Sequence, residues 1–222
     1  MRDSLKMVDI VIELTDARIT QSSRNPEIDK LIGNKPRIVM LNKADAADET
    51  INNAWCSFYA SKGIAALAAD CRSGKGLKAL LPMRRKVLSD ELSRRESRGN
   101  VGKPIRMMVV GIPNVGKSSF INRMAGGKRT KVEDRPGVTR SQQWVKVNGG
   151  PGLNNLDLLD MPGVLWPKFE DPLVGEKLAF TGAIKDDIMD IELLAARLLE
   201  FLNENYRQMI CGRYRLEENE VT

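Results

Sequence analysis

The 222-residue chain contains no histidine, and this absence restricts its chemistry more than any other feature of its composition. It excludes a Ser-His-Asp triad, a histidine-ligated metal and a histidine general base within the chain. Cysteine is scarce as well: the three residues are scattered and odd in number, which suits a reducing cytoplasm better than a disulfide scaffold. No apolar run approaches the roughly 20 residues of a membrane helix, and the first residues do not resemble a signal peptide. We therefore expect a cytoplasmic protein without a membrane partner.

Charged and apolar residues are abundant by comparison. The apolar fraction of 42% is ordinary for a globular protein, and the net charge is +6. Residues 1–170 hold 29 basic and 18 acidic side chains, whereas residues 171–222 hold 6 and 11. A basic body indicates a polyanionic partner, although a solvated surface of mixed charge explains the same counts equally well.

Apolar runs of strand length alternate with helix-forming segments along the first 170 residues. We expect strands at 8–14, 37–41, 64–68, 105–110, 144–147 and 156–159, the last two forming a hairpin. We expect helices ending near 33, around 49–59, from 76 to about 97, and at 118–125. This alternation predicts a mostly parallel sheet covered on both faces. Beyond residue 171, apolar residues recur at helical spacing over 188–202, so we expect a helical segment at 171–222 after a first domain at 1–170.

Residues 111–118 read Gly-Ile-Pro-Asn-Val-Gly-Lys-Ser and fit the phosphate-loop pattern G-x-x-x-x-G-K-[ST]. The glycines let successive backbone N–H groups face phosphate oxygens, and the following helix adds its positive N-terminal end. Lys117 is expected to reach the β- and γ-phosphates, and Ser118 to ligate Mg²⁺. A purely structural glycine-rich turn is disfavoured because the loop lies between an expected strand and helix. The expected nucleotide contacts here are Asn114, Val115, Gly116, Lys117, Ser118 and Ser119.

Asn42-Lys43-Ala44-Asp45 follows another expected strand and matches N-K-x-D, the guanine-reading pattern. The Asp45 carboxylate can accept hydrogen bonds from both the ring N1–H and the exocyclic amine of guanine, a pair of donors that adenine lacks. The stem of Lys43 can lie along the base, and Asn42 can tie this turn to the phosphate loop. Alone, the tetrapeptide is as readily an ordinary turn; beside a phosphate loop it predicts guanine specificity.

Asp160-Met-Pro-Gly163 ends the last expected strand and matches D-x-x-G, although such a sequence alone is a common turn. We expect Asp160 to hold Mg²⁺ through water and the Gly163 N–H to sense the γ-phosphate. Thr139 is the candidate switch threonine that completes Mg²⁺ coordination when the γ-phosphate is present, with Thr130 as a weaker competitor.

Two further positions depart from common GTPase patterns. Residues 70–76 stand where a loop supporting the guanine base is expected, so Cys71 and Arg72 are candidate base contacts, although the usual Ser-Ala pair is missing. Val164 takes the place directly after D-x-x-G where many GTPases have a water-orienting Gln, and it cannot polarise water. We expect slow hydrolysis without a partner. The residues expected to carry it are Lys117, Asn114, Thr139 and Gly163.

The order of these motifs is unusual, since the guanine motif at 42–45 precedes the phosphate loop at 111–118 and D-x-x-G at 160–163. The same site can form from a chain cut between D-x-x-G and the guanine motif. This arrangement resembles the circularly permuted GTPases of the YlqF/YawG family. The residues that carry the resemblance, over essentially the whole chain, are 16–18, 22–26, 42–45, 111–119, 136–143, 160–169 and 181–184.

The resemblance implies a P-loop NTPase fold, a three-layer α/β sandwich that is circularly permuted, followed by a small helical segment. It implies hydrolysis of GTP to GDP coupled to late assembly of the large ribosomal subunit, with the precursor particle and its rRNA as partners of a monomer. It also implies a K⁺ ion placed with the help of Asn114, for which a backbone-capping role is the alternative. Family members usually begin with a histidine-containing stretch and continue into a longer helical domain, so we expect residues 171–222 to be an incomplete C-terminal domain.

Two interpretations remain open from the sequence. A guanine-nucleotide-dependent scaffold that binds RNA or protein with little hydrolysis is the alternative to a ribosome-dependent GTPase, because Val164 replaces the Gln. Basic clusters at 84–86, 94–98 and 128–131 suit phosphate contacts, although a solvated helix face is the favoured interpretation of the first. Arg135 and Arg140 suit RNA phosphates better than a charge donated to the reaction.

Overall fold

A computed structural model of the chain describes residues 1–99, 103–127, 142–147, 155–163, 165–166, 169, 171–184 and 190–217. The chain divides into two compact units, Met1–Glu170 and Asp171–Thr222. In the part of the chain that is described, no helix is both long and apolar enough to cross a bilayer.

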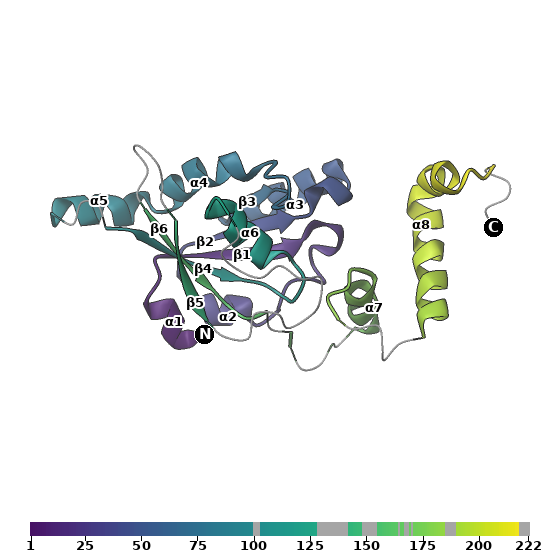
Figure 1. Cartoon of the computed structure of the whole chain (residues 1–222), viewed down its shortest axis with the longest axis horizontal. Coiled ribbons are helices and arrows are strands. Elements are labelled where there is room, and N and C mark those ends of the chain that lie inside the picture. Colours follow the sequence, from purple (N-terminus) through teal and green to yellow (C-terminus); the bar gives the residue numbers. More distant parts are fainter. Residues whose placement is uncertain are drawn as a thin grey trace. The chain divides into compact units, whose positions relative to one another are not determined.

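The first unit is built on a six-stranded sheet in the order β3-β2-β1-β4-β6-β5 (Figure 1). The strands are β1 (Ile10–Asp16), β2 (Arg37–Asn42), β3 (Ala65–Ala68), β4 (Ile105–Val110), β5 (Gln143–Val147) and β6 (Leu156–Asp160). All neighbours are parallel except β5 and β6, which pair antiparallel. The mostly parallel sheet and the final hairpin are thus confirmed. All seven residues of β1 are buried, as expected for a strand covered on both faces.

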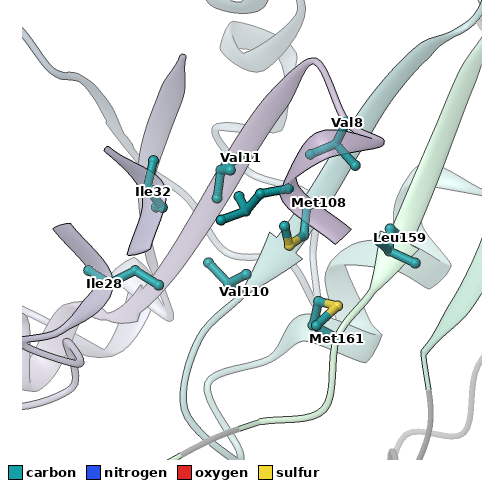
Figure 2. Packing of buried hydrophobic residues seen from close by; sticks show 9 residues of the cluster. Val8, Val11, Ile28, Ile32, Met108, Val110, Leu159 and Met161 are labelled. Carbon is teal, nitrogen blue, oxygen red and sulfur yellow. The ribbon is translucent and has the colours of Figure 1, made fainter. Parts of the chain in front are cut away.

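Helices cover both faces of this sheet. They are α1 (Arg2–Lys6), α2 (Ile28–Ile32), α3 (Glu49–Ser61), α4 (Leu80–Val87), α5 (Ser89–Ser97) and α6 (Lys117–Met124). Helices α1 and α2 lie on one side of the sheet, and α3 and α4 on the other (Figure 1). A buried cluster joins α1 and α2 to the sheet, and Figure 2 shows its side chains gathered over β1, β4 and β6. Met161, the second residue of D-x-x-G, belongs to this cluster, so the core reaches the edge where the motifs lie.

The single helix expected from 76 to about 97 is wrong. The structure has a 3-10 turn at Leu77–Ala79, then α4 and α5 separated at Leu88, whose φ of −102° and ψ of 11° are not helical. Leu77, Leu80 and Leu88 are buried, whereas α5 buries no residue. The buried helix therefore ends at Leu88, and a new, solvent-exposed helix begins with an acidic first turn.

Arg84 also differs from expectation. We expected 84–86 to form a solvated helix face, but the Arg84 side chain is only 1% exposed. Burial lowers its pKa, and the charge of Arg85 acts in the same direction. Within the described residues, its Nε and Nη1 atoms have no hydrogen-bond partner. Burial of Arg84 thus removes one of the three cations of this cluster from the solvated surface.

The second unit contains α7 (Pro172–Phe180) and α8 (Ile191–Tyr214). Asp171 caps α7 by accepting from the Leu173 N–H, and Asp190 caps α8 by accepting from two N–H groups of its first turn. An ion pair between Glu176 and Arg197 joins the two helices. The expected amphipathic helix exists, but it extends to Tyr214 and has a kink at Tyr206.

Candidate nucleotide-binding site

The N-K-x-D turn, the phosphate loop and the D-x-x-G segment follow β2, β4 and β6 at the same edge of the sheet. Asp16 ends β1 and pairs in register with Asn42, the last residue of β2. Asp160 ends β6 in register with Val109 of β4, whose last residue precedes the phosphate loop. Ligands of open α/β sheets bind outside the carboxyl ends of such strands. The permuted chain therefore brings its motifs together as the sequence predicts.

The phosphate loop packs directly against the guanine-reading turn. Gly116 has a φ of +100°, and a Cβ atom there would lie 2.2 Å from Nδ2 of Asn42. That amide donates a hydrogen bond to the Val115 carbonyl at 2.7 Å, and its oxygen accepts from the Cys71 N–H at 2.9 Å. The prediction that Asn42 ties its turn to the phosphate loop is confirmed. A single buried amide thus joins the phosphate loop, the guanine turn and the loop that follows β3.

Lys117, the first residue of α6, lies across the phosphate loop. Its side-chain nitrogen donates to the carbonyl oxygens of Gly111 at 3.1 Å and Ile112 at 2.7 Å. Burial lowers the pKa of Lys117 to about 8, and the attraction of Asp160 opposes that decrease only in part. The ammonium is therefore poised beside the loop, where phosphate oxygens would favour its charged form.

Gly163 brings the D-x-x-G segment to the same place. A Cβ atom at Gly163 would lie 2.8 Å from Nζ of Lys117 and 2.7 Å from the backbone nitrogen of Pro113. No side chain fits there without displacing the loop. The close approach places the Gly163 backbone next to the group that is expected to contact the γ-phosphate.

Asp160 is completely buried and only partly hydrogen-bonded. Gln143 donates to its Oδ2 at 3.4 Å, while Oδ1 has no hydrogen-bond partner among the described residues. Burial raises the pKa of Asp160 above its usual value, which the Gln143 hydrogen bond and the charge of Lys117 offset only in part. A buried carboxylate oxygen without a partner fits a cation or its bound water. Ser118 lies in the first turn of α6, next to Lys117.

The base side of the site is formed by the turn after β2 and the loop after β3. Lys43 has a left-handed backbone with φ +61°, and Asp45 lies 3.7 Å from the guanidinium of Arg72. The Cys71 thiol is buried 3.8 Å from the Met40 sulfur, and burial raises its pKa to about 12. The Cys71 side chain thus lies against Met40, and its backbone N–H donates to Asn42; its contact with the base stays a prediction.

Several predicted residues lie outside the described part of the chain. They are Thr130, Arg135, Thr139, Arg140 and Val164. Their roles stay predictions.

Sequence reasoning gave no role to Asp16 and Arg18. The structure places the Asp16 carboxylate 3.1 Å from the ammonium of Lys43, with Arg18 on the same carboxylate. The signal was present as Asp-Ala-Arg directly after a buried strand. Its meaning depends on the strand order, because β1 and β2 are neighbours only in the folded sheet.

The fold and the site together define a class of protein. A parallel α/β sheet with a phosphate loop, an N-K-x-D turn and a D-x-x-G segment at one edge is a P-loop GTPase. The strand order, with the guanine turn after β2 and the phosphate loop after β4, makes it a circularly permuted one.

Comparison with known proteins identifies the family. The family described as "50S ribosome-binding GTPase" matches residues 106–210. Ribosome biogenesis GTPase A of Priestia megaterium is 52% identical over 218 residues, which are 97% of this chain and 74% of the relative. The protein of the same name from Bacillus licheniformis is 50% identical over 216 residues, 97% of this chain and 75% of the relative. This chain belongs to the ribosome biogenesis GTPase A family and is a GTPase.

Two solved structures of YlqF proteins have the same fold as this chain. GNP-bound YlqF from T. maritima superposes with a TM-score of 0.63 at 25% identity, covering 91% of this chain and 72% of that one. The GDP-bound structure of TM YlqF gives 0.64 at 26% identity, covering 91% and 74%. The resemblance inferred from the motifs and the permuted P-loop fold are both confirmed.

Proposed function

We propose that this chain couples the hydrolysis of GTP to GDP and phosphate to late assembly of the large ribosomal subunit. The names of the relatives support the ribosomal role. The observation that best supports a nucleotide site is the buried amide of Asn42, which joins the phosphate loop to the loop after β3. In this role the chain would work as a monomer in the cytoplasm, with the precursor particle and its rRNA as partners.

The guanine base would lie between the turn after β2 and the loop after β3. Asp45 would accept from N1–H and the exocyclic amine, the stem of Lys43 would cover one face of the base, and Arg72 and the Cys71 backbone would border it. Asn42 would keep this side in register with the phosphates. The support is that Asp45 and Arg72 are already neighbours at 3.7 Å.

The phosphates would lie in the loop at 111–116 and against the N-terminus of α6. Lys117 would leave its two carbonyl partners for the β- and γ-phosphates, and Gly163 would report the γ-phosphate through its N–H. The remaining expected contacts are Asn114, Val115, Gly116, Ser118, Ser119 and Thr139. The close approach of Gly163 to Lys117 and Pro113 supports the placement of Lys117 and Gly163 at the γ-phosphate.

Magnesium fits the donors at this edge. Ser118, Thr139 and, through water, Asp160 would hold it, and the orphaned Oδ1 of Asp160 supports this assignment. When bound, Mg²⁺ neutralises charge that develops on the phosphate oxygens. We also propose that a K⁺ ion binds near Asn114. Its support is the left-handed backbone of Asn114, with φ +56°, in the middle of the phosphate loop.

Hydrolysis would depend on Lys117, Asn114, Thr139 and Gly163, because Val164 cannot orient water. The same feature favours a second function, a guanine-nucleotide-dependent scaffold that binds RNA or protein with little hydrolysis of its own. The two differ in turnover on the particle, not in nucleotide binding.

Multiple-turnover phosphate release separates these functions. The assay is run with and without large-subunit precursor particles, in K⁺ and again in Na⁺, with Lys117→Ala as the variant that lacks the phosphate contact. Stimulation by particles, lost in Lys117→Ala, supports the GTPase proposal. Particle binding that depends on GTP without any turnover supports the scaffold, and equal rates in K⁺ and Na⁺ exclude the potassium ion.

Magnesium is tested separately by binding. Ser118→Ala should bind GDP with the same affinity in Mg²⁺ and in EDTA, whereas the parent weakens in EDTA. Ser61→Ala, at an exposed serine of α3 whose hydroxyl donates to the Phe58 carbonyl, is the control. If Ser118→Ala keeps the parent's Mg²⁺ dependence, Ser118 is not a ligand.

A further inference from the structure

A buried carboxylate stands behind the guanine-reading turn. Asp16 is 2% exposed and ends β1. Its two oxygens accept from Nε of Arg18 at 2.9 Å and from Nη2 of Arg18 at 2.7 Å, and the ammonium of Lys43 lies 3.1 Å from Oδ2. The Asp16 N–H donates to Oγ of Ser23 at 2.8 Å, so the backbone at this point is fixed as well.

The chemistry of this group keeps it charged. Burial by itself raises the pKa of Asp16, but the hydrogen bonds from Arg18 and the charge of Lys43 outweigh it, and the pKa lies below its ordinary value. A buried anion with two cationic partners holds both of them strongly, because water competes little for the contacts. Lys43 is therefore fixed at two points: its backbone has a left-handed conformation, and its ammonium pairs with Asp16.

Arg18 extends the network to Asp45. The hydrogen bond to Asp16 raises the pKa of Arg18, and the negative charge of Asp45 adds to that increase. The 3-10 turns Ala17–Ile19 and Ala44–Ala46 pack against each other, so Arg18 and Asp45 are held on facing segments. Lys43 thus pairs with Asp16, the last residue of β1, and Asp45 faces Arg18 in the turn that follows β1.

We propose that Asp16 and Arg18 are positioning residues for guanine binding. Asp16 fixes the path of the Lys43 side chain along the base, and Arg18 holds the Asp16 carboxylate while facing Asp45. This inference rests on the proposed nucleotide site, and it assigns the base-binding geometry to β1, outside the N-K-x-D turn itself.

A double-mutant cycle tests it. GDP affinity is measured for the parent, Asp16→Asn, Lys43→Met and the double variant; methionine keeps an apolar stem but has no ammonium. Each single variant should lose about tenfold in affinity, the scale of one charged hydrogen bond, and the double variant should lose the same tenfold rather than a hundredfold. The control is Asp9→Asn, which removes a carboxylate paired with Arg95 at the opposite end of β1 and should bind GDP like the parent.

The outcomes are distinct. Additive losses of about a hundredfold in the double variant, or parent-like affinity of Asp16→Asn, overturn the inference, because a role in folding alone would not depend on Lys43. If Asp16→Asn lacks a cooperative thermal transition, Arg18→Gln replaces it in the cycle. Arg18 is about one-third exposed, and its removal should cost about threefold in the parent and nothing in Lys43→Met. Failure of the parent to bind GDP, with Lys117→Ala indistinguishable from it, rejects the nucleotide site itself.

Discussion

Lys117 carries its charge in a nearly buried position between two carbonyl oxygens. Its pKa of about 8 means that the free protein loses this proton in the mildly alkaline range. Bound phosphates favour the protonated form, so binding above that pKa requires uptake of a proton. Nucleotide affinity must then decrease as the pH rises through 8.

We predict that GDP affinity falls about fivefold between pH 7.0 and pH 8.8. Calorimetric titration in two buffers of different ionisation enthalpy measures both the affinity and the proton uptake. Proton uptake of zero at pH 8.8, with constant affinity, would show that Lys117 is fully charged in the free protein.

Base choice depends on one carboxylate. Replacing Asp45 by Asn exchanges an acceptor for a donor, so GTP binding should weaken about a hundredfold, while xanthosine triphosphate, whose exocyclic oxygen accepts from an amide, should gain relative to GTP. Competition between the two nucleotides against a labelled guanine nucleotide gives the ratio. Asp3→Asn, an exposed carboxylate on α1, is the control. An unchanged preference for guanine in Asp45→Asn would falsify the assignment.

The element that couples both halves of the site is the turn from the phosphate loop into α6. Gly116→Ala places a methyl group 2.2 Å from the Asn42 amide on a left-handed backbone, so Asn42 must move away from Val115. We expect the variant to lose more than a hundredfold in GDP affinity and about 2–3 kcal/mol in the free energy of unfolding.

Gly126→Ala separates backbone strain from the collision. Gly126 also has a positive φ, +69°, but a Cβ atom there meets nothing within 4 Å. It should lose only about 1 kcal/mol and keep the parent's affinity for GDP. Urea unfolding and nucleotide titration of both variants make the comparison. Equal effects of the two substitutions would mean that the Asn42 contact is unimportant.

Elements with strong local patterns could be predicted from the sequence. Residues 105–110 are expected as a strand and form β4, because five of the six residues are apolar and polar turns stand on both sides. The pattern did not reveal α1, since its five residues bury only Ser4 and Leu5 and show no periodicity. The spacing of Leu88 fits one continuous helix, although its backbone is not helical and α4 ends there.

The site residues, like the elements, could be predicted only where a local sequence pattern specifies them. Residues of a contiguous motif, such as Asn42, Gly116 and Lys117, could be identified because the chemistry of phosphate and guanine recognition fixes their spacing. Partners from other strands could not. Asp16 meets Lys43 only because β1 and β2 are neighbours, and Gln143 meets Asp160 only through the register of β5 with β6.

At the scale of the whole molecule, the permutation puts the D-x-x-G segment directly before the second unit in the chain. Trp166 and Phe169 stand in this connection, with their rings edge to face at 5.2 Å. We predict that Gly163 moves with the γ-phosphate and that this movement is transmitted along the chain toward Asp171. A rigid connection in which the two rings simply pack is the alternative.

Hydrogen exchange decides between these alternatives. We predict different protection over residues 163–184 between the GDP form and a form with a non-hydrolysable GTP analogue, while α3 exchanges equally in both. Equal protection across 163–184 in the two forms would leave the nucleotide without this path to the second unit.

The distance in sequence between Asn42 and Val115, 73 residues, also sets an order of events during synthesis of the chain. The three strands β1, β2 and β3 and the complete base-reading turn leave the ribosome before any residue of the phosphate loop. A nascent chain whose emerged part ends before β4 therefore exposes the free edge of β1 and holds an Asn42 without its carbonyl acceptor. Nucleotide can first be captured when β4 and α6 emerge and close that edge, so arrested nascent chains that end before Gly111 should retain no guanine nucleotide.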